Sequence, residues 1–356
     1  MIKRLLFNLT LFLLAVSCTK LSEENSVILK YGKLKVNTDI TIDTKAYTAI
    51  AATNELNITD LNYFFFSSSG KLLKYINIIR SQSATANPED IVVELPVGNI
   101  KVCVVANVNQ EQFQNVKTYD QLRSIKIHHF NSTLKNRIPF YGETTVLLEE
   151  DNEATGSVKL KRRMSRLNVC SIRNYLSGQL KGKTIQVTSI FLANIQGGFT
   201  IGEQNTGFWY NKFGRNDRNP AHIGDFDTMV PDGTSIWPFS LTTGNISIPH
   251  GMLWSTRNGS CLLYCFPNYT EVDENGWDSV FTPRYTRLVL ETVIDNVTYY
   301  YPVNLVGLRH NRSYDVRFII TRPGSSDPDT FDLVEFEDVF VDFGGIDGDF
   351  DIDIEM

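Results

Sequence analysis

Apolar and polar residues alternate with a period of two through most of this 356-residue chain, and this pattern restricts it to β-structure. Side chains of an extended strand point alternately to its two faces, so each such run predicts a strand with one buried face. Turn-forming Gly, Pro, Ser and Asn separate the runs. The clearest runs are residues 34–42, 61–79, 91–108, 144–150, 157–172, 182–195, 260–269, 285–305 and 312–322. We therefore predict an all-β fold of mainly antiparallel strands.

Local patterns add four predictions within this frame. The turns around Ser67–Gly70 and Pro96–Asn99 are expected to close hairpins, because Gly supplies the positive φ that tight turns need. Residues 110–125 form the one helical interval, with an apolar residue at every third position and neither Gly nor Pro. Within 157–172 the alternation changes phase between Met164 and Leu167, which predicts a β-bulge.

The length of the chain predicts two domains, because it exceeds what one hydrophobic core usually serves. The best linker is the polar stretch 174–183. The expected division is a signal peptide (1–17), a tether (18–30), an N-terminal β-sandwich (31–175), a C-terminal β-sandwich (182–331) and an acidic terminal strand segment (332–356). That last segment holds ten Asp or Glu and no Lys or Arg.

The first 18 residues have the pattern of a lipoprotein export signal. A basic start precedes an apolar stretch from Leu5 to Val16, and small residues lead to Cys18. The stretch is too short to span a bilayer, and the cysteine stands where a lipid such as palmitate is attached. We predict lipidation of Cys18 and anchorage to a membrane. An ordinary secretory signal is the alternative.

Charge and motif content argue against several functions. The formal net charge of −6 gives no reason to expect a nucleic-acid partner. None of the five histidines has a second ligand at metal-binding spacing, and no nucleophile elbow, phosphate loop or zinc-protease motif occurs. We therefore predict no metal, no cofactor and no enzymatic activity. Cys103, Cys170, Cys261 and Cys265 could form disulfides or remain buried free thiols, and the sequence leaves that choice open.

The C-terminal residues 350–356 would form a strictly amphipathic strand. Its apolar face carries Phe350, Ile352, Ile354 and Met356, and its other face carries acids. Burying four such side chains would contribute about 6–12 kcal/mol before ordering costs, so the strand needs a groove. The groove could belong to another subunit, which we favour, or to the chain's own domain. A calcium loop is rejected because Ile352 stands where the loop requires Gly.

Aromatic residues in the Gly- and Asn-rich stretch 196–250 suggest a second kind of site. Trp209, Tyr210 and Trp237 are candidates for stacking against sugars or contacting a host ligand. The alternative is that they pack in turns and in the core, because Trp is mostly buried on average.

Several runs, in this order and behind such a signal, resemble one known family. They are Leu61–Phe66 leading to Ser69–Gly70, Leu95–Gly98 before Val104–Asn107, Ile138–Gly142, Lys161–Leu167, Tyr299–Val303, Arg309–Tyr314 and Thr321–Gly324. The chain resembles the fimbrillins, which are subunits of the lipoprotein-derived type V pili. The resemblance implies two transthyretin-like β-sandwich domains, location at the outer membrane and cell surface, a role in adhesion, and other pilus subunits as partners.

The resemblance also implies assembly by strand exchange. In that family a protease removes the first strand, and the C-terminal strand of another subunit fills the groove. Lys45 is the candidate cleavage site. Known fimbrillins are cut after Arg, whereas the basic residues within 19–57 are all Lys. Without cleavage the chain would be an anchor or tip subunit. From a different class, the alternative is a monomeric surface lipoprotein that binds glycans.

Overall fold

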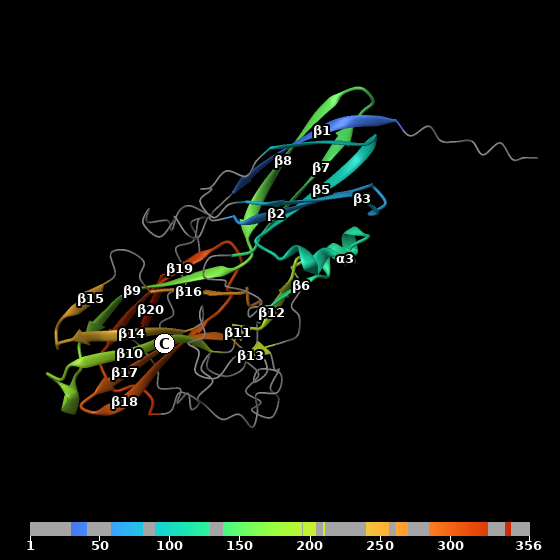
Figure 1. The fold of residues 1–356 in the computed structure, drawn as a ribbon. Helices are drawn as coiled ribbons and strands as arrows, with labels where there is room; N and C mark the ends of the chain where they lie inside the picture. The colour runs from blue at the N-terminus through green and yellow to red at the C-terminus, as the bar shows by residue number, and fades with distance from the viewer. Residues whose placement is uncertain are drawn as a thin grey trace, which may run out of the picture.

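The structure is a computed structural model that describes residues 30–40, 58–80, 90–128, 138–193, 195–203, 209–210, 240–255, 261–269, 285–326 and 339–342. Strands dominate these residues, as the alternation predicts. They form two units, each with its own hydrophobic core. The units lie one beyond the other along the molecule (Figure 1).

The first unit is built on a seven-stranded path in the order β3-β2-β5-β7-β8-β1-β4. Two short helices and a small strand follow β5. The elements are β1 (Tyr31–Ile40), β2 (Asp60–Phe66), β3 (Leu72–Ile79), β4 (Ile91–Pro96), β5 (Gly98–Ala106), η2 (Gln110–Phe113), α3 (Tyr119–Arg123), β6 (Lys126–His128), β7 (Phe140–Leu148) and β8 (Glu153–Arg162).

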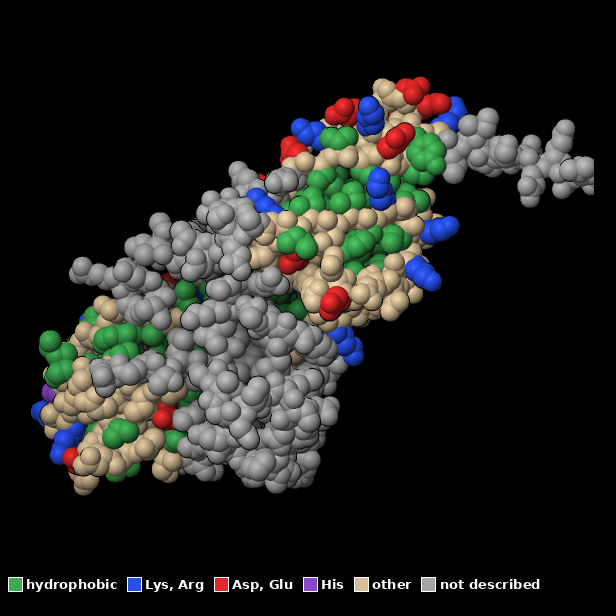
Figure 2. Space-filling view, viewed as in Figure 1, with side chains coloured by type: hydrophobic (Ala, Val, Ile, Leu, Met, Phe, Trp, Pro, Cys, Tyr) green, Lys and Arg blue, Asp and Glu red, His purple; other side chains and the backbone are tan. Residues whose placement is uncertain are grey.

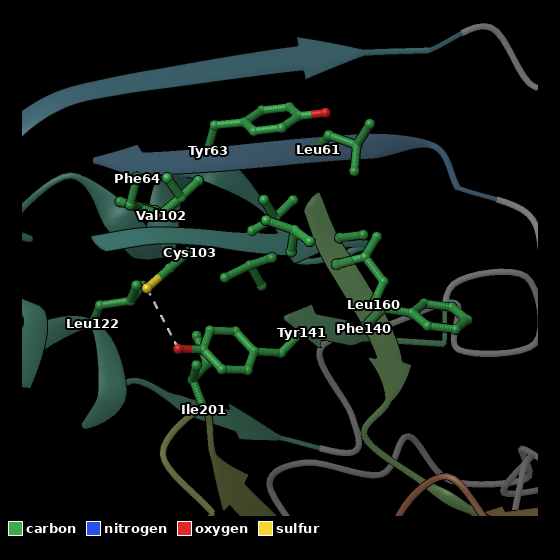
Figure 3. Packing of buried hydrophobic residues seen from close by; sticks show 14 of the residues in the cluster. Leu61, Tyr63, Phe64, Val102, Cys103, Leu122, Phe140, Tyr141, Leu160 and Ile201 are labelled. Atoms are coloured by element: carbon green, nitrogen blue, oxygen red, sulfur yellow. Dashed lines mark hydrogen bonds between the residues drawn. The ribbon is translucent and has the colours of Figure 1, made fainter. Parts of the chain in front are cut away.

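The core of the first unit lies between β1 and β8 on one side and β2, β5 and β7 on the other. Phe64 stacks parallel to Phe66 at 6.2 Å and edge-on against Phe113 at 5.1 Å. Figure 3 shows the part of this core around Cys103, where the Tyr141 hydroxyl donates a hydrogen bond to its sulfur at 3.5 Å. Ile201, from the second half of the chain, also lies in this core.

The second unit packs two sheets around one core. One sheet has the order β14-β10-β17-β18, and the other has the order β15-β9-β19-β20 with β16 also paired to β9. The elements are β9 (Ser165–Asn174), η4 (Gly178–Leu180), β10 (Ile185–Ala193), β11 (Ile195–Gln196), β12 (Gly198–Thr200), β13 (Trp209–Tyr210), β14 (Ser240–Ile248), β15 (Leu253–Ser255), β16 (Leu262–Cys265), β17 (Thr286–Ile294), β18 (Val297–Leu305), β19 (Ser313–Ile320) and β20 (Val339–Asp342).

The chain passes between the units at Arg163 and Met164. The predicted bulge is wrong, because the phase change marks the end of β8 and the start of β9 in a different sheet. Leu167, Val169 and Ile172 of β9 lie in the second core. Residues 165–175, which we expected in the N-terminal domain, therefore pack with the second unit, and we propose the domain boundary at Arg163–Met164.

Two other local predictions also need correction. The turn at Pro96–Asn99 closes no hairpin, because β4 pairs with β1 while β5 pairs with β2 and β7. The helical interval is divided into η2, which ends at Phe113 with Gln114 as its C-cap, and α3, which begins after Thr118 and is capped by it with a capping box. The hairpin at Ser67–Gly70 is confirmed by the antiparallel pairing of β2 with β3. Two pairs, β1 with β8 and β9 with β19, are parallel.

Candidate functional site

The first strand, β1, is the element on which the strand exchange expected from the resemblance would act. Its alternating sequence places Leu34, Val36 and Thr38 in the core, while Lys33 is exposed and Lys35 half-buried on the outer face. Leu34 and Val36 have no exposed surface. Burial of their side chains stabilises β1 by about 1.5–3 kcal/mol each.

β1 fills a slot between two strands that come much later in the sequence. It pairs in parallel with β8, where Val36 lies opposite Gly156, and antiparallel with β4, where Leu34 lies opposite Val93. Within the described residues β4 pairs with no other strand. We call the space that β1 occupies between β8 and β4 the β1 slot. Withdrawing β1 would leave both of its walls with unpaired backbone groups.

The side-chain contacts of β1 include one across the core and one at the surface. The Thr38 hydroxyl lies 3.2 Å from the Tyr63 hydroxyl across the core. The Lys35 ammonium lies 3.3 Å from the Asp90 carboxylate, but both side chains are partly open to solvent and such pairs contribute little. The backbone ladders and the inward apolar side chains also retain the strand. An extended segment with the same alternation could make equivalent contacts.

The sequence-predicted site residues lie largely outside the described residues. Cys18, Lys45, Trp237 and all four donor residues, Phe350, Ile352, Ile354 and Met356, fall in this category. Trp209 and Tyr210 form β13, whose backbone pairs with Gln196 and Ile195 of β11. The sequence pattern did not identify β8 and β4 as the walls of the β1 slot, because alternation predicts where strands lie in the sequence but not which strands pair.

A second feature, the joint between the units, is built around the buried Arg163. Its guanidinium donates hydrogen bonds to the Glu203 carboxylate and, at 3.1 Å, to the Ile201 carbonyl. It also stacks over the Tyr141 ring at 4.6 Å. The same Glu203 oxygen lies 3.7 Å from Nε2 of His310, so residues of both units meet at one carboxylate. β6 and β12 pair nearby and add a backbone link. We call Arg163, Glu203 and His310 the joint cluster.

The joint cluster favours an ionised Glu203 and a neutral His310. Burial acts to raise the pKa of Glu203, but the hydrogen bond and positive charge of Arg163 outweigh it and hold that pKa below its usual value. Burial and the charge of Arg163 lower the pKa of His310, and Lys161 and Arg312 act in the same direction. Protonating His310 would thus add positive charge where arginine is already concentrated.

We expect His310 to make stability pH-dependent. Because its pKa is lower in the folded state, its contribution is fully present above about pH 6.5 and is lost as the pH falls toward the lowered value. The His310→Gln variant should flatten the decline in unfolding free energy over this range in urea titrations. The contribution of Glu203 to stability changes in a separate range: it is present above about pH 4.5 and is lost as the pH falls below that value. Equal slopes for the variant and the wild type would contradict this prediction.

The described residues offer no sign of a chemical centre. Among them no group of His, Cys, Asp and Glu is placed to hold a metal, and no helix is long and apolar enough to cross a membrane. Cys103, Cys170, Cys261 and Cys265 are free thiols. Burial raises the pKa of Cys103 and of Cys265 to about 12, so both stay protonated near neutral pH.

Comparisons with known structures find the same fold in other proteins. A candidate cell adhesion protein from Bacteroides eggerthii matches with a TM-score of 0.57 at 15% identity, covering 89% of this chain and 96% of that one. A fimbrilin from Porphyromonas gingivalis matches with a TM-score of 0.56 at 13% identity, covering 85% and 94%. At such identities the likeness concerns the fold. A search of curated proteins finds no match.

A protein-family model also matches this chain. The model of the fimbrillin-A associated anchor proteins Mfa1 and Mfa2 matches residues 30–234, which is more than half of the chain. The match begins just before β1 and includes the first unit, Arg163 and Glu203. The chain therefore belongs to the family of fimbrillin-A associated anchor proteins Mfa1 and Mfa2.

Proposed function

We propose that this chain is exported as a lipoprotein on Cys18 and serves as a pilus subunit that exchanges strands with its neighbours at the β1 slot. Its family gives it a fimbrial role, as a structural subunit or an anchor, at the cell surface. The chain would be attached to the outer membrane through the lipid, and proteolysis would trigger its polymerisation. Its partners would be other pilus subunits, and the assembled fibre would mediate adhesion to a host protein or glycan.

The placement of β1 is the observation that carries the proposal. β1 ends at Ile40 and the next described residue is Ile58, so Lys45 lies on the connection between β1 and β2. A cut there would leave β1 held to the rest of the first unit by noncovalent contacts alone, including its ladders and its inward side chains. Its loss would open a slot that accepts an extended strand with apolar residues at every second position.

The C-terminal residues have the pattern that such a slot requires. Phe350, Ile352 and Ile354 alternate with acids as Leu34, Val36 and Thr38 alternate with outward residues in β1. The donor side chains are larger than those of β1, so they would displace it only if the slot is first vacated or can widen. This accounts for a proteolytic trigger.

The test is to treat residues 19–356 with a low dose of trypsin and run the product unboiled on a denaturing gel. We expect a ladder of detergent-resistant multimers after loss of the N-terminal segment. The Lys45→Gln variant, cut poorly at the candidate site, and a chain lacking residues 345–356 should both stay monomeric. Palmitate labelling of cells that is lost in Cys18→Ser would support the lipid part.

Either of two results would contradict strand exchange. One is a ladder that persists without residues 345–356. The other is a monomer band in every sample after β1 has verifiably been removed.

The anchor role is the second candidate, because the matched family consists of anchor proteins. A chain that keeps β1 has a filled slot and cannot accept a donor strand. It would hold the membrane end of a fibre through Cys18. Resistance of the Lys45 region to proteases on whole cells, with β1 retained in the isolated protein, would favour this candidate.

A further inference from the structure

The two far ends of the molecule carry opposite charge. β8 runs from Glu153 at one end to Arg162 at the joint, and β9 continues from Ser165 to Asn174 at the other end. At about 3.3 Å per residue, these two ten-residue strands separate the ends by about 65 Å of extended chain. Figure 1 shows the β7–β8 turn and the end of β9 at opposite extremes of the described elements.

The first end, which we call the acidic pole, is formed by the β7–β8 turn and the start of β1. Carboxylates outnumber its two bases, Lys30 and Lys33. Leu147, 58% exposed, and Tyr31, 46% exposed, supply apolar surface beside them. Figure 2 shows several red side chains at this end, with blue ones between them. The acids are Glu149, Glu150, Asp151 and Glu153, all exposed.

The opposite end, which we call the basic pole, is formed by the end of β9, the η4 turn and the β14–β15 turn. These segments are tied together, since Asn174 donates a backbone hydrogen bond to the Met252 carbonyl at 3.1 Å and its side chain donates to the Lys183 carbonyl at 3.0 Å. Asp295, bound to Lys183 at 2.8 Å, is the acid among them. The bases are Arg173, Lys181 and Lys183.

Exposed apolar side chains lie beside these bases. Leu253 lies opposite Arg173 in the β15–β9 ladder, so both side chains project from one face of the sheet. The Arg173 guanidinium stacks on the Tyr175 ring at 5.3 Å and donates to its hydroxyl at 3.1 Å. Met252 is 57% exposed. An apolar patch with a charged rim is typical of a protein interface.

We propose that the acidic pole of one copy of this chain docks on the basic pole of a second copy. Each pole pairs exposed apolar side chains with a net charge, negative at the acidic pole in spite of the Lys30–Glu150 pair and positive at the basic pole in spite of the Lys183–Asp295 pair. The two net charges are complementary, whereas two identical poles would repel. The contact joins different surfaces of identical molecules, so every added copy leaves one pole of each kind free and the row can grow.

This contact is independent of strand exchange and needs no cleavage. It would orient copies head to tail before a donor strand enters a slot. If β1 is later removed, Lys30 and Lys33 leave with it, and the acidic pole loses its two bases. Tyr31 leaves as well, so cleavage would make the acidic pole more negative while removing part of its apolar surface.

The test is sedimentation velocity of uncut residues 19–356 at about 50 mM and about 500 mM NaCl, a range over which exposed charge pairs become screened. We expect reversible self-association that weakens at the higher salt. Glu150→Lys with Asp151→Lys should weaken it about tenfold or more, and Arg173→Glu with Lys181→Glu should do the same. Lys159→Glu, an exposed charge in the middle of β8, is the matched control and should leave it unchanged.

Mixing the two pole variants gives the decisive result. The acidic-pole variant then has two basic poles and the basic-pole variant has two acidic poles, so the poles of one variant are complementary to those of the other. We expect the mixture to recover association that neither variant shows alone. No self-association at low salt, or no recovery in the mixture, would overturn the proposal. Failure of strand exchange would instead remove only the detergent-resistant ladder, so the two failures are distinguishable.

Discussion

Replacing Val36 by Asp is expected to lower the unfolding free energy of the first unit by about 3–5 kcal/mol. Val36 has no exposed surface, so the change places an unpaired carboxylate in the core between β8 and β4. The cost arises in the β1 slot itself, and the same substitution should therefore speed the loss of β1 after a cut.

The measurement is urea unfolding followed by far-UV circular dichroism. Residues 30–164 contain no Trp and Trp254 packs against the second core, so tryptophan fluorescence supplies a reporter of the second unit. Lys33→Asp puts the same residue on the exposed face of β1 and should cost less than about 1 kcal/mol. Equal losses for the two variants would show that the inward face of β1 contributes nothing to the slot.

Replacing Arg163 by Ala is expected to cost about 2–4 kcal/mol and to uncouple the two units. The change removes the hydrogen bonds to Glu203 and to the Ile201 carbonyl and the stacking on Tyr141, all in a site where the arginine side chain is 4% exposed. We expect the dichroism and fluorescence transitions, coincident in the wild type, to separate in the variant.

Lys161→Ala is the matched control, because Lys161 is an exposed base in β8, two residues before Arg163. A double-mutant cycle with Glu203→Gln should yield a coupling energy of about 1–3 kcal/mol between Arg163 and Glu203. Unchanged midpoints and coincident transitions in Arg163→Ala would mean that β6–β12 pairing and apolar packing alone join the units.

The joint between the units shows what could be predicted from the sequence and what required the tertiary structure. The change of phase near Met164 was visible in the sequence, but a bulge and a break between strands look alike when only alternation is read. The choice depended on Arg163, whose partner Glu203 lies forty residues later. A similar limit applied to Pro96–Asn99, where turn residues were correctly placed but the flanking strands pair with β1, β2 and β7 instead of each other.

The sequence by itself determined the all-β class, most strand positions and the resemblance to fimbrillins, because alternation, turn residues and short motifs are local properties of the chain. Only the tertiary structure decided that β1 lies in parallel beside β8, that β9 belongs to the second core, and that the acidic and basic poles stand at opposite ends. These facts depend on pairing between strands as far apart as β1 and β8, and long-range packing energy, which no local pattern contains, selects that pairing.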